Sequence, residues 1–227
     1  MLQSFINKGE KRGGVFKYNV RLNLNNIIRI FREIKEYVFP VRRLTDRFKS
    51  ISSLEQLKNF IKERSAQVTQ ATLYGYVKTR MGFKYTIMFE DEKFLESLEI
   101  AKWNIYVTAI ADCTFYTFSY LLDKKGIFKI KDANDIFIQI MKEERSNGLS
   151  SKIYNEGKLD FDRRIKEINW KNYHNENPFK VSGLALYKWA PIAEHLKELD
   201  REIVLNSIKY KWNNVESEFK NLDIKFI

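Results

Sequence analysis

The sequence predicts an all-α protein, a bundle of about five to seven helices in which the central and C-terminal helices are long. Only nine glycines and three prolines occur in 227 residues, so few positions interrupt a helix. Apolar residues recur at helical spacing along most of the chain, and 44% of all residues are hydrophobic. Strict alternation, which is typical of strands, occurs nowhere for long, and the best strand candidate is the single segment YTIMF at 85–89.

The N-terminal part divides into two predicted regions. Residues 1–21 are expected to be a flexible basic arm, because their glycines and lysines bury too little apolar area to become ordered. Residues 22–227 are expected to be a single helical domain. Its first amphipathic helix is predicted to begin near Asn25 and to end before Pro40, which cannot continue a helix.

Two long helices are predicted next. Ser53 followed by Gln56 matches a capping box, so a helix is expected over 53–81. Asp91 is expected to cap the following helix, which extends to about Leu122. Small residues in the second half of the 53–81 helix predict close approach by a neighbouring helix: Ala66, Ala71 and Gly75.

The helix that follows Asp91 is the most apolar part of the sequence. Asp112 is the one charged residue between Trp103 and Leu122, so length alone would permit a membrane span. A central aspartate is costly in lipid, and we therefore expect a buried bundle helix and no span. An unpaired buried carboxylate would cost several kcal/mol. Asp112 is thus expected to have a partner, either a Lys or Arg of the 53–81 helix or hydroxyls of adjacent helices.

Asp112 has two alternative interpretations. Asp112, together with Lys102, is a candidate for a polar network that fixes helix register. The same residues are candidates for a ligand site or a catalytic site.

The next segment is predicted to contain two short helices. Asp132 or Asp135 can begin the first, which ends by Gly148. A polar loop is expected after it, and Asp160 is expected to cap a second short helix. The sequence HNENP at 174–178 predicts a turn.

The C-terminal helix is the clearest pattern in the sequence. Pro191 suits the first turn of a helix, and an apolar stripe then continues for about thirty residues. The stripe consists of Ile192, Leu196, Leu199, Ile203, Ile208, Trp212, Val215, Phe219 and Leu222.

Positive charge is concentrated near the N-terminus. The formal net charge is +11, and residues 1–50 hold twelve Lys/Arg against four Asp/Glu, which is +8. In YGYVKTRMGFKYTIMF, at 74–89, basic residues also alternate with aromatic ones. The N-terminal charge is either a solvated surface or a contact for a protein partner or another acidic surface, with nucleic acid or an anionic membrane as alternatives. The 74–89 stretch is interpreted as a helix end and connection whose aromatic residues pack inward, with a nucleic-acid surface as the alternative. The candidate binding residues are Arg29, Arg32, Lys35, Arg42, Arg43, Arg80 and Lys84.

Sequence motifs give little support to catalysis. The chain lacks a GxSxG nucleophile elbow, and neither His174 nor His195 neighbours the single cysteine, Cys113. It also lacks Glu-x-x-His pairs and phosphate-binding glycine loops, so neither a metal nor another cofactor is expected. A lone cysteine and an N-terminus without a continuous apolar segment predict a cytoplasmic protein.

Three segments resemble a family of α-proteobacterial proteins of uncharacterised function. They are SAQVTQATLYGYVKTRMG at 65–82, MFEDEKFLESLEIAKWNIY at 88–106 and WAPIAEHLKELDREIVLNSIKYKWNNV at 189–215. The resemblance implies a bacterial, cytoplasmic, helical protein. Some members have an automatic esterase label, but the resemblance brings no catalytic residues to positions of this sequence.

The sequence therefore favours a non-catalytic helical binding or assembly protein with a basic N-terminal region. One alternative is an esterase-like hydrolase whose site forms only in the tertiary fold, around Asp112, Lys102, Cys113 or a histidine. Another is peripheral attachment to an anionic membrane through the helix over 25–39.

Overall fold

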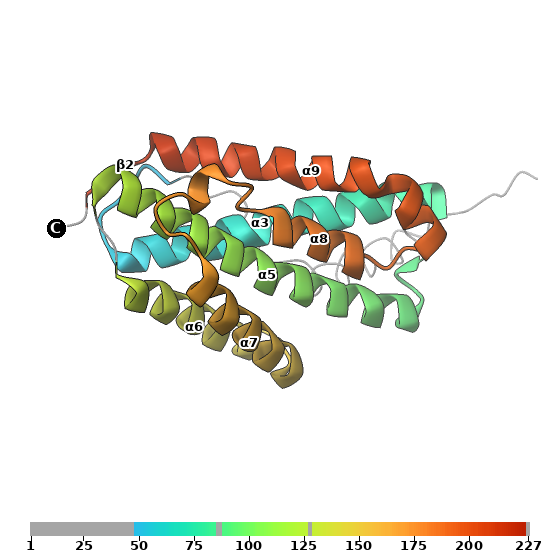
Figure 1. Ribbon diagram of the computed structural model, residues 1–227. Helices are drawn as coiled ribbons and strands as arrows, with labels where there is room; N and C mark the ends of the chain where they lie inside the picture. The colour runs from blue at the N-terminus through green and yellow to red at the C-terminus, as the bar shows by residue number, and fades with distance from the viewer. Residues whose placement is uncertain (1–47, 85–87, 127–128, 226–227) are drawn as a thin grey trace, which may run out of the picture.

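Six α-helices make up most of the described part of the molecule, which confirms the all-α prediction (Figure 1). The computed structural model describes residues 48–84, 88–126 and 129–225. Its helices are α3 (Leu54–Met81), α5 (Glu92–Lys125), α6 (Ile130–Ser146), α7 (Ser151–Glu167), α8 (Lys180–Trp189) and α9 (Glu194–Asn221). The minor elements are the 3₁₀ turns η1 (Gly82–Lys84) and η2 (Tyr173–Asn175) and the strands β1 (Ser50–Ile51) and β2 (Asp223–Ile224).

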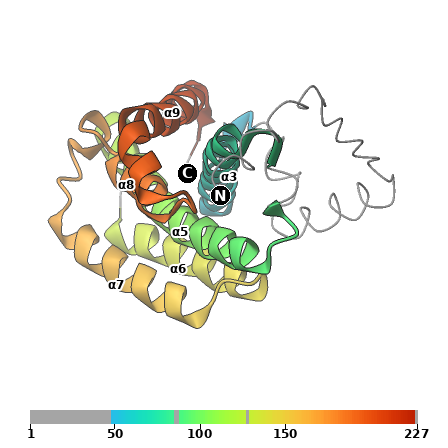
Figure 2. The same ribbon diagram turned by 90° about the vertical axis from the view of Figure 1, so that its right-hand side faces the viewer.

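Four of the helices form a bundle in which α3 contacts α5, α5 contacts α8, α8 contacts α9, and α9 contacts α3 (Figure 2). Each neighbour in this ring runs antiparallel to the next, as the colours of Figure 1 show. Strands β1 and β2 pair in parallel, Ser50 with Asp223 and Ile51 with Ile224. This pair joins the chain just before α3 to the chain just after α9.

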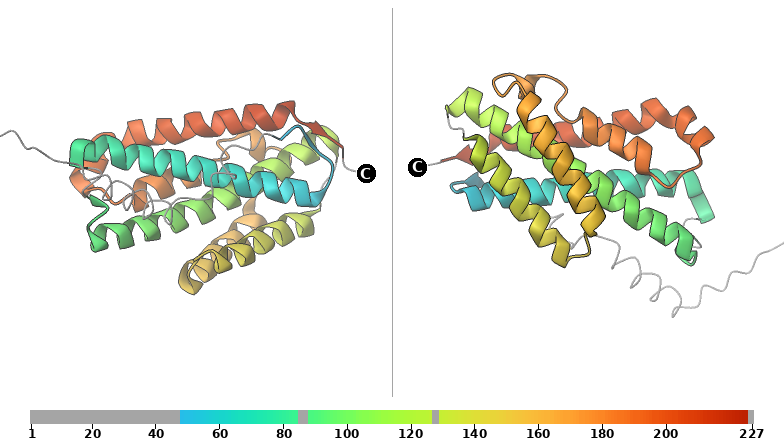
Figure 3. Two further views of the ribbon diagram at one scale, coloured as in Figure 1. Left: turned by 180° about the vertical axis from the view of Figure 1, so that it is seen from behind. Right: turned by 60° about the horizontal axis from the view of Figure 1, so that its bottom comes forward.

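Helices α6 and α7 form a hairpin that packs across α5 on the outside of the bundle (Figure 3). Gly157 of α7 permits this packing, because a Cβ atom there would lie 2.3 Å from Val107 Cγ1 of α5. The predicted close approach in α3 is wrong at two positions. Gly75 has no neighbouring atom within 4 Å of where a Cβ would stand, and Ala71 is exposed.

Capping residues set the ends of the two long helices as predicted. The Ser53 hydroxyl accepts a hydrogen bond from the Gln56 N–H at 3.2 Å. The Gln56 side chain accepts from the Ser52 N–H at 2.7 Å, one residue earlier than in a standard capping box. Asp91 accepts from the N–H groups of the first turn of α5, and Gly126 ends that helix with a left-handed conformation.

Helix α5 supplies the centre of the core. Among the described residues it is the one helix long and apolar enough to cross a membrane, and 83% of its most apolar window is buried inside the protein. Burial of this extent is typical of a core helix, because α3, α6, α7 and α8 all pack on it.

The prediction for the segment after Gly148 is wrong, and the helix that follows it was missed. Helix α7 begins at Ser151 with Ser150 as its N-cap, so the expected loop is helical and Asp160 lies inside the helix. Helix α8 was not predicted at all. It is only ten residues long and lacks a side-chain cap of its own, so neither its periodicity nor its ends distinguish it from a loop.

The last helix begins later than predicted and buries less of its stripe. Helix α9 begins at Glu194, so Pro191 precedes its first turn. Leu199 and Ile203 are 75% and 69% exposed. The later members of the stripe are buried, namely Ile208, Trp212, Val215 and Phe219.

Several predictions fall outside the described residues. These are the flexible arm over 1–21, the amphipathic helix over 25–39 and residues 85–87 of the strand candidate.

Candidate functional site

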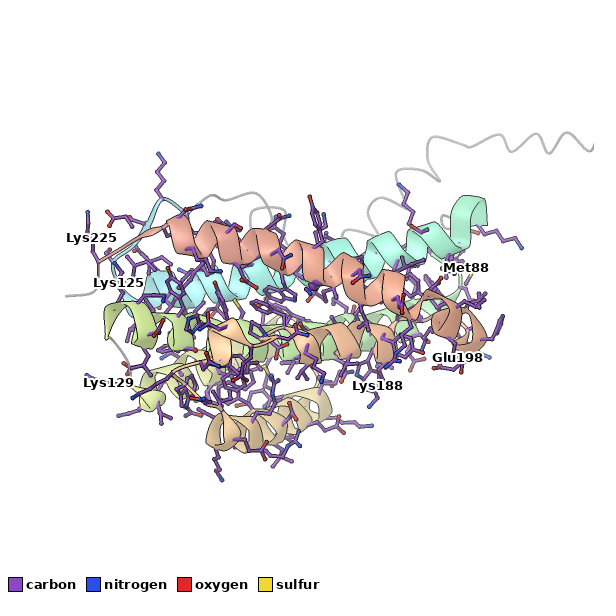
Figure 4. All side chains as sticks on the ribbon, turned by 45° about the horizontal axis from the view of Figure 1, so that its top comes forward. Met88, Lys125, Lys129, Lys188, Glu198 and Lys225 are labelled. Carbon is purple, nitrogen blue, oxygen red and sulfur yellow. The ribbon has the colours of Figure 1, made fainter. Side chains whose placement is uncertain are left out.

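A cleft of about 610 Å³ lies between η2, the first half of α8 and one flank of α9. Helices α8 and α9 run antiparallel, and Figure 4 shows Lys188 and Glu198 together at the end where one helix turns into the other. The cleft lies toward the other end of this helix pair, where the turn before α8 runs beside α9. Residues of α9 line it at helical spacing: Arg201, Leu205, Ile208, Trp212 and Glu216.

An aromatic stack forms the floor of the cleft. The rings of Phe179 and Trp212 lie 4.1 Å apart and 8° from parallel, and both side chains are buried. At Gly183 α8 lies close to α9, since a Cβ there would be in van der Waals contact with Leu205 and Ile208 at 3.4 and 3.5 Å. The floor is therefore densely packed.

Asp112 holds this floor in place through Ser182. Its carboxylate accepts the Ser182 N–H at 2.7 Å, and the Ser182 hydroxyl in turn accepts from Trp212 Nε1 at 3.0 Å. Because Ser182 lies in the first turn of α8, Asp112 of α5 acts as the N-cap that α8 itself lacks. The same carboxylate forms a buried ion pair with Arg164 of α7.

The partner of Asp112 differs in origin from the expected one. It is Arg164 of α7, whereas the buried Arg64 of α3 pairs with Glu218 of α9. Burial raises the pKa of the Asp112 carboxyl, while Arg164 and the Ser182 N–H act in the opposite direction. The network joins α5, α7 and α8, which favours the interpretation that Asp112 has a structural role.

The turn over the cleft is fixed by Tyr173. Its hydroxyl donates to the Pro178 carbonyl at 2.7 Å and lies 3.4 Å from the Arg164 guanidinium. Arg164 also lies over the Phe115 ring, 5.0 Å from its centroid. Turn, floor and core therefore form one connected unit, and the cleft is preformed.

His174 lies at one end of the cleft beside a serine and an aspartate. Its Nδ1 is 3.0 Å from Ser119 Oγ, and its Nε2 is 3.4 Å from Asp123 Oδ2. Ser119 is fully buried, and its hydroxyl also accepts the His174 backbone N–H at 3.0 Å. This arrangement ties η2 to α5 and leaves the hydroxyl no access to a substrate. Burial lowers the pKa of the His174 imidazole.

Three cations stand on the rim of the cleft: Lys180, Arg201 and Lys209. All are exposed, and none pairs with a carboxylate within the described ranges. Of the two rim carboxylates, Glu216 pairs with Lys220 at 3.1 Å, whereas Glu176 accepts from the neutral amide of Asn172 at 3.0 Å and keeps its charge. The three cations outnumber this carboxylate, so the cleft presents net positive charge above an apolar floor.

The two predicted basic residues that the structure describes, Arg80 and Lys84, do not line this cleft. Arg80 forms an ion pair with Asp200 of α9, whose carboxylate also accepts from the Tyr76 hydroxyl at 3.0 Å. Lys84 is exposed at the end of η1. The other candidates lie outside the described residues: Arg29, Arg32, Lys35, Arg42 and Arg43.

The remaining candidates for chemistry are separated. Lys102 is buried, pairs with Glu99 at 2.8 Å and lies over the Trp103 ring, and burial lowers its pKa. Burial raises the pKa of the Cys113 thiol, which disfavours the reactive thiolate. His195 is exposed at the start of α9. Among the described residues no cluster of three or more His, Cys, Asp or Glu side chains could hold a metal ion.

Comparison with family models finds no match, and comparisons with curated proteins and with solved structures find none either. The functional argument therefore rests on the geometry of the cleft.

The sequence patterns did not predict the rim cations because these are far apart in the sequence, and Arg201 lies between Asp200 and Glu202. The residues Arg201, Leu205, Ile208, Trp212 and Glu216 do share one face of α9, as their spacing indicates. This face could have been identified as a distinct stripe. This face of α9 borders a cleft because α8 packs beside it, and the sequence pattern did not predict α8.

Proposed function

We propose that this protein is a non-catalytic binding and assembly protein, and that its α8–α9 cleft binds an acidic region of a protein partner. The observation that supports this proposal is the set of rim cations, which have no carboxylate partner in the described part of the chain, above a rigid, buried aromatic floor. Opposite charge on a partner would be attracted to this rim, and a preformed floor lowers the ordering cost of binding.

The basic N-terminal region would add a longer-range attraction to the same partner. Residues 1–50 have a net charge of +8, and such charge raises association rates with acidic partners at low salt. A variant with neutral residues at the five predicted basic positions should therefore recover less partner at low salt. Those positions are Arg29, Arg32, Lys35, Arg42 and Arg43.

The test is native purification of the tagged, full-length protein at low and high salt, with identification of bound protein, nucleic acid and lipid. The cleft variant is Arg201→Glu/Lys209→Glu. The matched control is Lys152→Glu/Lys166→Glu, which makes the same charge change at exposed positions of α7. Helix α7 lies on the side of the bundle away from α9 (Figure 1).

The proposal predicts that one acidic protein is recovered at low salt, is depleted at high salt, is lost from the cleft variant and is kept by the control. Equal loss from both variants would contradict a role for the cleft, since general charge would explain it. Recovery of nucleic acid or anionic lipid in place of a protein would contradict the partner class.

A further inference from the structure

The cleft contains amide side chains whose positions suit a peptide backbone. Asn206 and Asn213 of α9 both line it, both are exposed, and neither has a hydrogen-bond partner within the described part of the chain. An asparagine offers one acceptor and two donors, which match the C=O and N–H groups of a peptide unit. Residues seven apart on a helix share one face and lie about 10 Å apart along its axis.

We propose that the partner segment binds in extended conformation, with its backbone paired to Asn206 and Asn213. This inference rests on the proposed function and specifies the chemistry of the partner at the same site. Three residues of extended chain span about 10 Å, which matches the spacing of the two asparagines. The cleft follows α9 from Arg201 to Glu216, about 20 Å, which is room for about six extended residues.

The residues on the two sides of the cleft indicate which side chains the bound segment has. Carboxylates would face Arg201 and Lys209 on α9 and Lys180 on α8, the three rim cations. Apolar side chains would contact the floor beside Ile208, where Gly183 and Leu184 form the opposite wall. The ligand class is therefore an acidic segment with interspersed apolar residues.

The charge of the cleft favours a foreign acidic segment over the chain's own N-terminal region as the bound segment. Residues 1–50 have a net charge of +8, which the rim cations would repel. A foreign acidic segment gains attraction from the same rim.

The test uses fluorescence anisotropy with full-length protein and three labelled hexapeptides. The first has the sequence Glu-Leu-Glu-Leu-Glu-Leu, in which the glutamates and the leucines lie on opposite faces of an extended chain. The second replaces each glutamate with lysine, and the third keeps the first sequence but has alternate backbone nitrogens methylated. The protein variants are Asn206→Ala/Asn213→Ala and, as the control, Asn214→Ala on another flank of α9.

The acidic peptide should bind, and the lysine peptide should not. Backbone methylation and the Asn206→Ala/Asn213→Ala change should each weaken binding by about tenfold, the effect of losing one or two hydrogen bonds. The Asn214→Ala control should bind as the wild type does.

Two results would overturn the inference. One is equal binding of the methylated and unmethylated peptides, which excludes backbone pairing. The other is failure of the acidic peptide to bind while the partner is still lost from Arg201→Glu/Lys209→Glu, which means that the cleft binds a folded acidic surface. In that second case the proposed function stands and the extended segment does not.

Discussion

Asp112 performs two tasks at once, because one carboxylate neutralises Arg164 and caps α8 from another helix. Replacing it with asparagine keeps the shape but leaves the buried guanidinium with only the more distant Asp160 carboxylate, at 3.6 Å. We expect Asp112→Asn to lower the free energy of unfolding by about 3 kcal/mol, as measured by urea denaturation. Amide hydrogen exchange should also become faster in the first turn of α8.

The matched control is Asp162→Asn, which removes the carboxylate of a partly exposed pair with Lys158. It should cost no more than about 0.5 kcal/mol. Adding Arg164→Met to Asp112→Asn should restore part of the lost stability, because the buried charge is then gone. If Asp112→Asn and Asp162→Asn cost the same, the buried network does not stabilise the fold.

His174 makes stability depend on pH. Burial holds its pKa below the ordinary value of 6.5, against attraction from Asp123 and Glu216 and with repulsion from Lys124 and Lys220. The unfolded chain therefore binds the proton more readily, so the contribution of His174 is complete above about pH 6.5 and is lost as the pH falls toward the folded pKa.

The test compares the wild type with His174→Asn, whose amide oxygen can still accept the Ser119 hydroxyl. Between about pH 7.5 and pH 5.5 the wild type should lose more stability than the variant does. Equal losses in urea denaturation would mean that His174 does not titrate differently on folding.

At the scale of elements, the packing of α7 on α5 depends on one glycine. A Cβ at Gly157 would overlap Val107 Cγ1, and the branched valine side chain has little freedom to move. Gly157→Ala should destabilise the protein by about 1–3 kcal/mol in thermal or urea unfolding.

Val107→Ala should compensate for this change in the double variant, because it removes the overlapping methyl group. Gly75→Ala is the matched control, since it lies in a helix with open space around the new Cβ. It should stabilise the protein by about 0.5–1 kcal/mol. A stabilising Gly157→Ala would show that the two helices are not held at this distance.

The elements that the sequence predicted well are those with local end signals and long periodicity. Ser53, Asp91 and Gly126 fix the ends of α3 and α5 through contacts within a few residues. The N-terminus of α8 is instead capped by Asp112, 70 residues earlier in the chain. No local sequence pattern indicates a contact between residues so far apart. In the same way, the periodicity of α9 alone does not show that the described helices leave part of the first half of its apolar stripe exposed.

At the scale of the whole molecule, the cleft results from unequal helix lengths. Helix α8 has 10 residues and α9 has 28, so part of the α9 flank is covered by a turn and not by a helix. The sequence indicated positive charge and a helical bundle, but it placed the binding residues on the N-terminal region and on Arg80 and Lys84. In the structure Arg80 pairs with Asp200, and a separate set of cations lines the cleft without a carboxylate partner among the described residues.

The most direct test of the central claim is site-specific photo-crosslinking in cells. A photoreactive amino acid is placed at Lys209 on the rim of the cleft, or at Lys152 on α7 as the control, with the rest of the chain unchanged. The account predicts one dominant crosslinked acidic protein from position 209 and none from position 152. The same product from both positions, or a product from position 152 alone, would contradict the cleft as the binding site.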